Sequence, residues 1–526
     1  MKKPTDKPAP GVSPARIACI LLLALLVSCT PVGPEFVRPQ VELPQDWSNL
    51  DRHGLESSPV KQPQWWRVFD DPVLNRLVEM AWKQNNSLEI AGLRVLEARA
   101  QLGIAQGSQY PQSQLAAGSA TYTSPANIAG NGSNFWQYGI GASTSWEIDF
   151  WGRYRRGIES ADAAYLASIA ARDQALVLLT AQVVRAYTII RINQEQLRYA
   201  RENVAIQQRS YDITSVMFRN GSDSELDMQQ ALTLLLSTEA TIPGFEIALK
   251  QSLNALNTLL GKAPGTIDPL LDENYGIPEL PGQIQLGIPA DLLRRRPDVR
   301  QAELNALAQN ARVGLAEADL YPSFSLTGSL SLVAGGQGGS GFGDLFSSDA
   351  LTFSIGPSFV WPFLNYGRIR NNVRVQDARL QQALVNYREV VIQSAREAED
   401  ALVSFNGSQA QTEILVKTVE SARRSNALSS LRYREGFSDY QRVLDSQQSL
   451  FGQQQRLTTQ RGTSVLSLVD LYTSLGGGWD SQNTREFISD ESRETMKQRT
   501  NWGELLEGDL PLKNDGPGTV NNGESQ

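Results

Sequence analysis

The stretch from Ile158 to Asn220 reads IESADAAYLASIAARDQALVLLTAQVVRAYTIIRINQEQLRYARENVAIQQRSYDITSVMFRN and contains neither glycine nor proline. Its length without a helix breaker predicts one unbroken helix. A helix of about 60 to 70 residues is roughly 100 Å long, which exceeds the size of a globular domain. Apolar side chains spaced by seven residues also predict left-handed supercoiling against neighbouring helices. These positions are Ile169, Leu176, Val183, Ile190, Leu197, Val204, Tyr211 and Phe218.

The chain contains two copies of one sequence unit, and this helix belongs to the first copy. Tyr110-Pro111 recurs as Tyr321-Pro322, at an offset of 211 residues. Farther along, three glycines recur at a constant offset of 215, as expected when rigid helices separate them. Each repeat should therefore run short helix, strand hairpin, very long helix, turn and second helix. The glycine pairs are Gly152 with Gly367, Gly221 with Gly436, and Gly261 with Gly476.

The second long helix repeats the seven-residue spacing with more gaps. Gly221 and Gly436 should each turn the chain back into a helix of about 35 residues. Pro243-Gly244 should break the first of these return helices. The second set of positions is Leu384, Val391, Ala398, Phe405, Thr412, Val419, Asn426 and Tyr433.

Four stretches alternate apolar with small polar residues, which is the period of a β-strand. They are residues 112–123, where the alternation is less clean, 136–146, 323–332 and 351–361. Strands of about ten residues, apolar on one face and small-polar on the other, with aromatic residues near their ends, are typical of a transmembrane barrel. Half of a soluble β-sandwich would alternate in the same way, but nothing else in the chain could cover its apolar face.

Four strands cannot close a barrel alone, because about eight is the smallest number that closes. An open strand edge cannot lie in lipid, so the chain must associate. Two copies give eight strands and three give twelve; inward-facing serine, threonine and glycine favour the larger, wet barrel. No run of 18 apolar residues exists, so we expect no membrane-spanning helix.

The N-terminus resembles a lipoprotein signal peptide. A basic segment precedes an apolar run from Ile17 to Val27, which is too short to span a bilayer as a helix. Residues 26–29 read Leu-Val-Ser-Cys and resemble a lipobox, so we expect cleavage before Cys29 and lipidation of that cysteine. Thr30, rather than aspartate, implies export to the outer membrane. The alternative is an ordinary signal peptide with an incidental cysteine.

The composition excludes much chemistry. The chain of 526 residues has a net charge of −8, which argues against nucleic-acid binding. It contains one histidine, His53, and two cysteines, Cys19 and Cys29. A Cys/His zinc site, a disulfide framework and a Cys-His dyad are therefore not expected. We expect no enzymatic activity, no catalytic or metal-binding residues, and no cofactor besides the lipid on Cys29.

Several motifs resemble the outer-membrane factor (TolC-like) family, in its OprM/NodT-like branch of efflux lipoproteins. They are residues 29–34, Trp65-Trp66, residues 318–324 and, above all, Asp291-Leu292-Leu293-Arg294-Arg295-Arg296-Pro297-Asp298-Val299-Arg300-Gln301-Ala302-Glu303. The resemblance implies an α+β membrane protein. Three chains would form a channel-tunnel, with a 12-stranded transmembrane β-barrel in the outer membrane and a long α-helical coiled-coil barrel in the periplasm.

The same resemblance implies partners and a function. It predicts an outer-membrane exit duct of a tripartite efflux system, which docks on a periplasmic adaptor protein and an inner-membrane RND pump. The duct would passively conduct drugs or other small molecules, and the pump would choose the cargo. The segments expected are the signal peptide 1–28, an anchored segment 29–64, repeats 65–276 and 277–480, and a polar tail 481–526 whose last fifteen residues are disordered.

The arginine-rich motif is interpreted as structural. Arg294, Arg295 and Arg296 precede Pro297-Asp298, the expected start of a helix. We expect the arginines to pair with carboxylates and helix C-termini where the two repeats meet. A basic patch that selects cargo is the alternative.

The two glycine turns are the candidate periplasmic tips. The resemblance implies that Gly221, Ser222, Gly436 and Phe437 contact the adaptor. It also implies a gate just inside the tips, in which Asp445 of three copies forms a carboxylate ring. These residues could instead be solvated groups beside exposed turns.

The remaining gate residues are also carried over from the family. Tyr433 resembles a residue that hydrogen-bonds an aspartate of the first hairpin, here Asp227, and Arg434 resembles a latch between the coils. Relatives often have arginine three residues after the ring aspartate, where this chain has Gln448, so that salt bridge is expected to be absent and Arg442 to substitute. The group Tyr433, Arg434, Arg442 and Asp445 is expected to face Asp227 on the first hairpin.

Other classes remain open at this point. A coiled-coil adhesin on a barrel anchor would expose its helices outside the cell, and an enzyme would need a catalytic repertoire that the chain lacks. Within the channel class, an outer-membrane duct for type I protein secretion is the alternative; the lipobox and the arginine-rich motif favour small-molecule efflux.

Overall fold

The computed structural model describes residues 31–41, 55–57, 64–124, 134–271, 276–281, 284–286, 295–335, 341–477 and 488–506. Cys29, Arg294 and the last fifteen residues lie outside these ranges, and so do the predictions made for them. The chain divides into two compact units, and each unit takes residues from both repeats. The first contains Met1–Pro39, Glu97–Ala167 and Ala302–Tyr387; the second contains Gln40–Leu96, Ser168–Gln301 and Arg388–Gln526.

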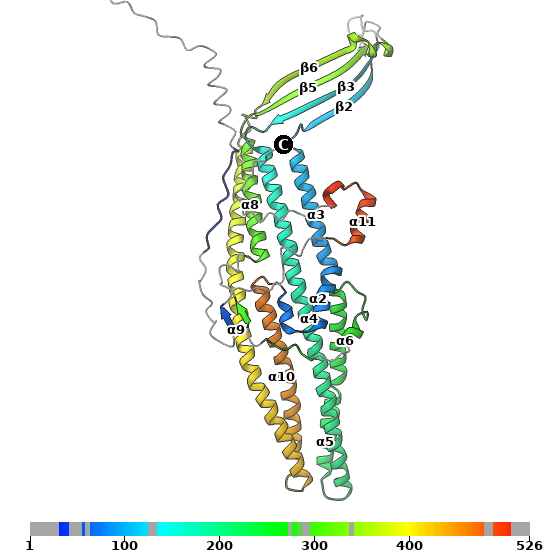
Figure 1. Ribbon diagram of the computed structural model, residues 1–526, viewed down its shortest axis with the longest axis vertical. Helices are drawn as coiled ribbons and strands as arrows, with labels where there is room; N and C mark the ends of the chain where they lie inside the picture. The colour runs from blue at the N-terminus through cyan, green and yellow to red at the C-terminus, as the bar shows by residue number, and fades with distance from the viewer. Residues whose placement is uncertain are drawn as a thin grey trace, which may run out of the picture. The chain divides into compact units, whose positions relative to one another are not determined.

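The two long helices have the same length. Helix α4 (Arg153–Arg219) and helix α9 (Arg368–Arg434) each contain 67 residues, and their bounds differ by the offset of 215 found in the sequence (Figure 1). Gly152 and Gly367 precede them with φ of 76° and 81°, a left-handed conformation that favours glycine. The predicted pair of very long helices is confirmed.

Identical turns end both long helices. The Ser222 N–H donates to the Met217 carbonyl at 2.8 Å, and the Phe437 N–H donates to the Arg432 carbonyl at 2.8 Å. The glycine before each donor, Gly221 or Gly436, has a φ of 76° or 78°. This is the Schellman arrangement, which satisfies a terminal helix carbonyl. The repeat seen in the sequence is therefore also a repeat of backbone geometry.

The return helices differ between the repeats. In the first repeat, α5 (Glu225–Glu239) ends before α6 (Ile242–Leu259), and Pro243 lies in the first turn of α6. In the second repeat, α10 (Tyr440–Ser474) runs unbroken for 35 residues. The predicted break at the proline is confirmed. It occurs there because proline has no N–H donor and is tolerated only in the first turn of a helix, where none is needed.

The first unit contains one antiparallel sheet with the order β2-β3-β5-β6. Its strands are β2 (Ser113–Thr123), β3 (Phe135–Ile148), β5 (Ser323–Gly335) and β6 (Leu351–Val360). The register places Leu330 opposite Ala142 and Phe353, and Ser329 opposite Ser143 and Ser354. Residues opposite one another share a face, so one face is apolar and the other small and polar, as predicted.

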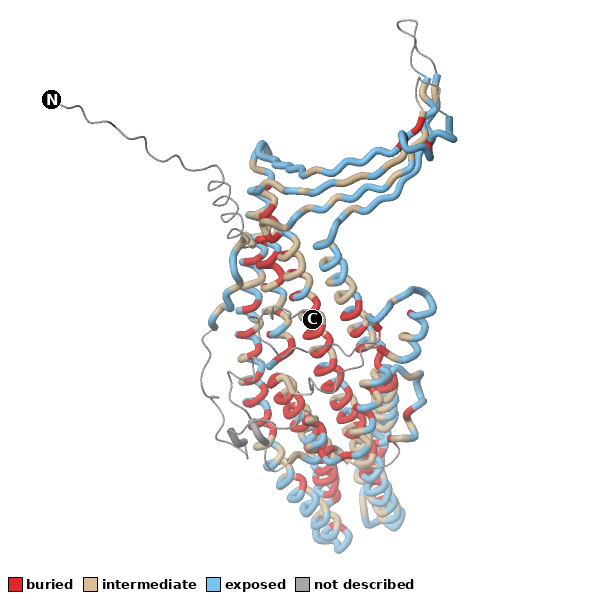
Figure 2. Tube along the Cα trace, turned by 45° about the horizontal axis from the view of Figure 1, so that its top comes forward, coloured by how far each residue is buried: buried red, intermediate tan, exposed pale blue. Residues whose placement is uncertain are grey.

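The four strands are exposed over most of their length (Figure 2). The exposed residues include Leu330, Phe353 and Ile355. Aromatic rings gather at both ends of the strands. At one end, Trp136 lies between Tyr122 and Tyr138, with ring centroids 5.2 and 6.0 Å apart. At the other end, Phe324 contacts Phe150 and Phe359. Two aromatic belts flanking an apolar band match the two interfaces of a bilayer.

Shorter elements complete the two units. They are α2 (Pro72–Gln84), α3 (Asn86–Gly107), α8 (Pro297–Ala318), α11 (Asp490–Arg499) and the 3-10 helices η1 (Trp65–Phe69), η2 (Asp268–Leu271), η3 (Phe342–Phe346), η4 (Ser348–Ala350) and η5 (Gly503–Leu506). Strands β1 (Leu55–Ser57) and β4 (Ile284–Leu286) form a small parallel sheet that the sequence did not predict.

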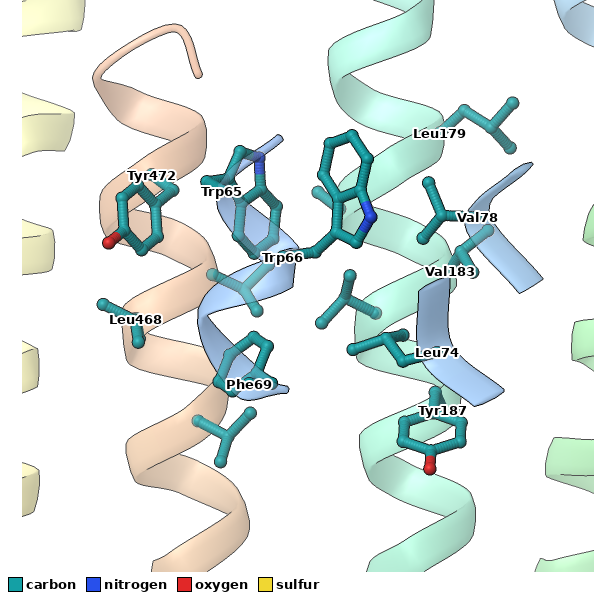
Figure 3. Close-up of a cluster of buried hydrophobic side chains, with 14 of the residues drawn as sticks. Trp65, Trp66, Phe69, Leu74, Val78, Leu179, Val183, Tyr187, Leu468 and Tyr472 are labelled. Carbon is teal, nitrogen blue, oxygen red and sulfur yellow. The ribbon is translucent and has the colours of Figure 1, made fainter. Parts of the chain in front are cut away.

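The main apolar core lies in the second unit. Trp65 and Trp66 of η1 are 1% and 2% exposed, and Trp65 stacks on Tyr472 of α10 with ring centroids 5.2 Å apart (Figure 3). Val183 of α4 and Leu74 of α2 pack in the same cluster. The Trp-Trp pair therefore fastens the start of the first repeat to the end of the second.

The seven-residue stripe of α4 is buried only in part. Side chains from Ile169 to Leu197 are buried at that spacing, whereas Val204 is only half-buried. Beyond Leu197 the buried side chains include Asn203 and Gln207, each 1% exposed. The buried face thus changes from apolar to polar along one helix.

Within the described residues, two helical stretches are long and apolar enough, by length and composition alone, to cross a membrane: α4 and Glu225–Leu259. Most of the apolar window in α4 is buried, as in a core helix, but little of the window in Glu225–Leu259 is. The absence of a membrane-spanning helix therefore stays a prediction.

The described C-terminal residues fold onto α3. The Glu89 carboxylate of α3 accepts hydrogen bonds from the Ser489 and Ser492 hydroxyls at 2.5 and 2.6 Å. Leu96 of α3 packs with Met496 of α11 in a small apolar cluster. Residues 488–506 are therefore part of the folded molecule, although the sequence indicated only a polar tail there.

Candidate functional site: the helical tips and their gate residues

The predicted adaptor-contact residues lie at the two glycine turns. Gly221, Ser222, Gly436 and Phe437 are all exposed, and the Phe437 side chain is 74% exposed. A Cβ added at either glycine would meet nothing within 4 Å. The tips therefore present an exposed aromatic ring beside open backbone.

Tyr433, on the last turn of α9, makes a buried link to the first hairpin. Its side chain is 5% exposed, and its hydroxyl donates a hydrogen bond to Oδ2 of Asp223. The prediction named Asp227 as the partner, and that assignment is wrong. Asp223 lies in the loop directly after Gly221, whereas Asp227 already belongs to α5. Burial and the neighbouring Asp223 carboxylate raise the pKa of Tyr433, so the hydroxyl remains a donor.

Asp227 is hydrogen-bonded to the N-cap residue of its own helix. Its backbone N–H donates to the Ser224 hydroxyl at 3.2 Å, and its Oδ2 accepts from that hydroxyl at 2.6 Å. Ser224 is thus the N-cap residue of α5. Burial, with the Asp227 carboxylate nearby, raises the pKa of Tyr440 to about 12.

The remaining predicted gate residues are exposed. Asp445 accepts a hydrogen bond from Gln441 at 2.8 Å, and Arg442 lies 3.7 Å from Asp439. Arg442 therefore pairs with Asp439, the N-cap residue of its own helix, and its role as a substitute for the missing arginine stays a prediction. Asp445 and Arg434 remain open to solvent, as side chains lining a pore would be.

A small apolar cluster holds the two hairpins together at the tip. It contains Ala231 and Leu234 of α5, Tyr433 of α9, and Tyr440, Val443 and Leu444 of α10. The rings of Tyr433 and Tyr440 meet edge to face, with centroids 5.4 Å apart. At the tip itself, the described link between the hairpins thus consists of the Tyr433–Asp223 hydrogen bond and a few apolar contacts.

Sequence reasoning missed Asp223 and Tyr440. Two aspartates follow Gly221 within six residues, so either could have been the partner of Tyr433. Spacing along the chain cannot decide between them, because the choice depends on where the loop turns. Tyr440 begins α10, and it is buried in a cluster with Tyr433 of its own hairpin and Leu234 of the first hairpin.

Of the arginines in this motif that the structure describes, Arg296 alone has a buried side chain. Its guanidinium donates to Asp298 at 2.7 Å, to Glu397 of α9 at 2.7 Å, and to the Ser474 carbonyl at the end of α10 at 2.8 Å. Carboxylates and a helix C-terminus are the partners expected for this motif. Burial opposes the charge, but these carboxylates raise the pKa of Arg296. Arg295 is exposed.

The segment after the predicted lipid site is held in the first unit. The Val32 N–H donates to the Trp151 carbonyl at 3.0 Å, and the Arg156 guanidinium donates to Glu35 at 2.8 Å. A Cβ on Gly152 would lie 2.3 Å from the Cβ of Pro31, so only glycine permits this approach. The described chain is therefore fixed, from two residues after Cys29, beside the junction of β3 and α4.

The model of the outer membrane efflux protein family matches residues 77–262 and 288–477, which are most of the two repeats. The chain belongs to this family. Nodulation protein T of Rhizobium leguminosarum is 31% identical over 88% of this chain and 94% of its own length. The cation efflux system protein CusC of Escherichia coli is 30% identical over 89% of this chain and 100% of its own length.

A solved structure of the outer-membrane channel OprN has the same fold. Its TM-score is 0.80 at 31% sequence identity, and the likeness covers 85% of this chain and 99% of that one. Membership of the outer membrane efflux family gives this chain an outer-membrane location and an efflux function. The predicted family, function and location are confirmed.

Proposed function

We propose that three copies of this chain form the outer-membrane exit duct of a tripartite efflux system of the RND type. The observation that carries the proposal is the four-stranded sheet, whose outer strands β2 and β6 have no strand partner on their free sides among the described residues. A strand edge in lipid costs several kcal/mol per unpaired group. Pairing β2 of one copy with β6 of the next would close a 12-stranded barrel.

Exposed apolar side chains on the helices support association. Leu226 and Leu236 of α5, Ile247 of α6, and Val403 and Ile414 of α9 are all exposed in the single chain. Association would remove this apolar surface from water, which is favourable. Neighbouring copies would cover them in a coiled-coil barrel that lines the periplasmic path.

The partners proposed are a periplasmic adaptor and an inner-membrane RND pump. The exposed tips at Gly221-Ser222 and Gly436-Phe437 would contact the adaptor. Cargo would be drugs, cations or other small molecules chosen by the pump; the relative CusC carries cation efflux in its name. The chain would act passively, without enzymatic activity or cofactor, and with a covalent lipid on Cys29 as an additional anchor.

The gate proposed lies just inside the tips. The Tyr433–Asp223 hydrogen bond would hold the hairpins of each copy together, and Asp445 of three copies would form a ring that binds cations. A closed state held by so few contacts is low in energy, so adaptor binding could open it. Arg434 would add a latch to the neighbouring coil.

Conductance of the purified protein in a planar lipid bilayer tests the duct and its ring. We expect low conductance, block of the remaining current by trivalent cations, and loss of that block in Asp445→Ala. The matched control is Asp400→Ala, which removes an exposed carboxylate of α9 paired with Arg396. Equal cation block in all three proteins would exclude Asp445 from the constriction.

A further inference from the structure

Between two apolar clusters of the second unit, α4 and α10 meet through polar side chains. The main core includes Ile190 of α4 and Val465 of α10. The tip cluster includes Val443 and Leu444 of α10, with Tyr211 of α4 packed against it. Five polar side chains between the clusters are here called the amide band; they are Asn203, Gln207 and Ser210 of α4, and Gln447 and Gln454 of α10. Apolar side chains such as Leu450 of α10 are also buried along this stretch.

Two hydrogen bonds cross the amide band, seven residues apart on each helix. The Asn203 amide donates to Oε1 of Gln454 at 2.7 Å, and the Gln447 amide donates to the Ser210 hydroxyl at 2.6 Å. Asn203 and Gln447 are each 1% exposed, and Gln454 is 5% exposed. The band is thus as deeply buried as the apolar clusters on either side.

The band is incompletely satisfied. Gln207 lies between the two bonds and is 1% exposed, yet neither its Oε1 nor its Nε2 has a partner in the described part of the chain. Oε1 of Gln447 also has none there. A buried polar group without a partner costs free energy that it regains when water reaches it. Separation of the helices at this level would therefore release a cost.

On the side of the amide band away from the tips, the two helices make a tight apolar contact. Gly462 of α10 lies against Ile192 of α4, and a Cβ on that glycine would be 2.1 Å from the Ile192 Cδ1. The Ile192 side chain fills the space beside Gly462, and this contact resists separation of the two helices because separation would leave a void. The seam is therefore fixed at this contact and weaker toward the tip.

We propose that the amide band is the segment where α10 parts from α4 when the gate opens, with the Ile192–Gly462 contact as the pivot. The inference rests on the proposed gate function. Parting of the band exposes amides that water can solvate, whereas parting of an apolar seam would expose hydrocarbon. The few contacts at the tip then keep α4 and α10 together, although the amide band between these helices is itself weak.

Accessibility of residue 207 to a water-soluble thiol reagent tests the proposal. Gln207→Cys is compared with Ser464→Cys, whose serine is 0% exposed and bonds Thr412 between α9 and α10 at 3.0 Å. Both are placed in the otherwise wild-type protein and in the gate-loosening background Tyr433→Phe. We expect that loosening speeds labelling at position 207 by about tenfold or more and leaves position 464 unchanged.

Conductance provides the second measurement. Gln207→Leu fills the unsatisfied position with an apolar side chain, so it should lower the conductance of Tyr433→Phe while trimer yield stays at the wild-type level. If Tyr433→Phe raises conductance but labelling at 207 stays slow, the inference is overturned and the gate stands. If Tyr433→Phe has wild-type conductance, the gate proposal fails and the inference fails with it. Faster labelling at both positions would show general loosening and would also overturn the inference.

Discussion

Among single residues, Tyr433 decides how firmly the two hairpins are held at the tip. Tyr433→Phe keeps the ring contacts and removes only the hydroxyl that Asp223 accepts from. We expect a loss of about 1 kcal/mol at the gate and a higher conductance in a planar bilayer. The control is Tyr440→Phe, because the Tyr440 hydroxyl has no hydrogen bond to another described side chain.

The same measurement separates the two aspartates. Asp223→Asn should raise conductance as Tyr433→Phe does, because it weakens the charge-assisted bond. Asp227→Asn should leave conductance nearer to wild type, since that carboxylate bonds Ser224. If Asp227→Asn raised conductance more than Asp223→Asn, Asp227 would be the functional partner of Tyr433.

Arg296 is the residue whose loss should most damage assembly. Arg296→Ala leaves Asp298, Glu397 and the Ser474 carbonyl without their donor. The two carboxylates left behind are partly exposed, so losing their buried donor should cost about 1–3 kcal/mol. We expect a lower yield of trimer and a lower unfolding midpoint in urea. Arg295→Ala is the matched control, because the Arg295 side chain is exposed and should tolerate removal. Changed cargo preference in Arg296→Ala at normal yield would argue for a basic selectivity patch instead.

Among the elements, α11 depends on one carboxylate. Hydrogen bonds from Ser489 and Ser492 lower the pKa of Glu89. Docking is therefore strongest above the ordinary glutamate pKa of about 4.3, and it weakens as the pH falls through the lowered value in the folded protein. Hydrogen-exchange protection of residues 488–506 should fall in that acidic range. Glu89→Ala should show the same low protection at neutral pH.

The control for this prediction is Glu97→Ala, which removes an exposed carboxylate of the same helix, bonded only to Gln101 among the described residues. Protection of α11 should then stay at the wild-type level. If Glu89→Ala also retains full protection, the apolar contacts of Leu96 and Met496 hold the helix alone.

For the whole molecule, the open sheet edges predict a fixed stoichiometry. Native mass spectrometry in detergent should show three chains, because three sheets give the twelve strands expected of a wet barrel. The same spectra should show an acylated Cys29 as the first residue. Cys29→Ser should weaken membrane anchoring and still give trimers, since the strands supply their own apolar area. A monomer that conducts would contradict the closure argument.

Periodicity and breakers along the chain predicted much of this structure. The length of α4, the turns at Gly221 and Gly436, the break at Pro243 and the faces of the strands all follow from neighbouring residues, because helix and strand periods depend on local backbone geometry. The internal repeat could be read for the same reason. These features need no knowledge of what lies opposite each face.

Only the tertiary structure decided which side chains meet. It paired Tyr433 with Asp223 rather than Asp227, and it buried Arg296 while Arg295 stayed exposed. It also placed Asn203 and Gln207 inside the seam where the apolar spacing had pointed to Val204. A polar side chain is buried where an opposing helix supplies polar partners or keeps water out. The two helices that meet in this way carry residues some 250 positions apart in the sequence. No local pattern in the sequence contains that information.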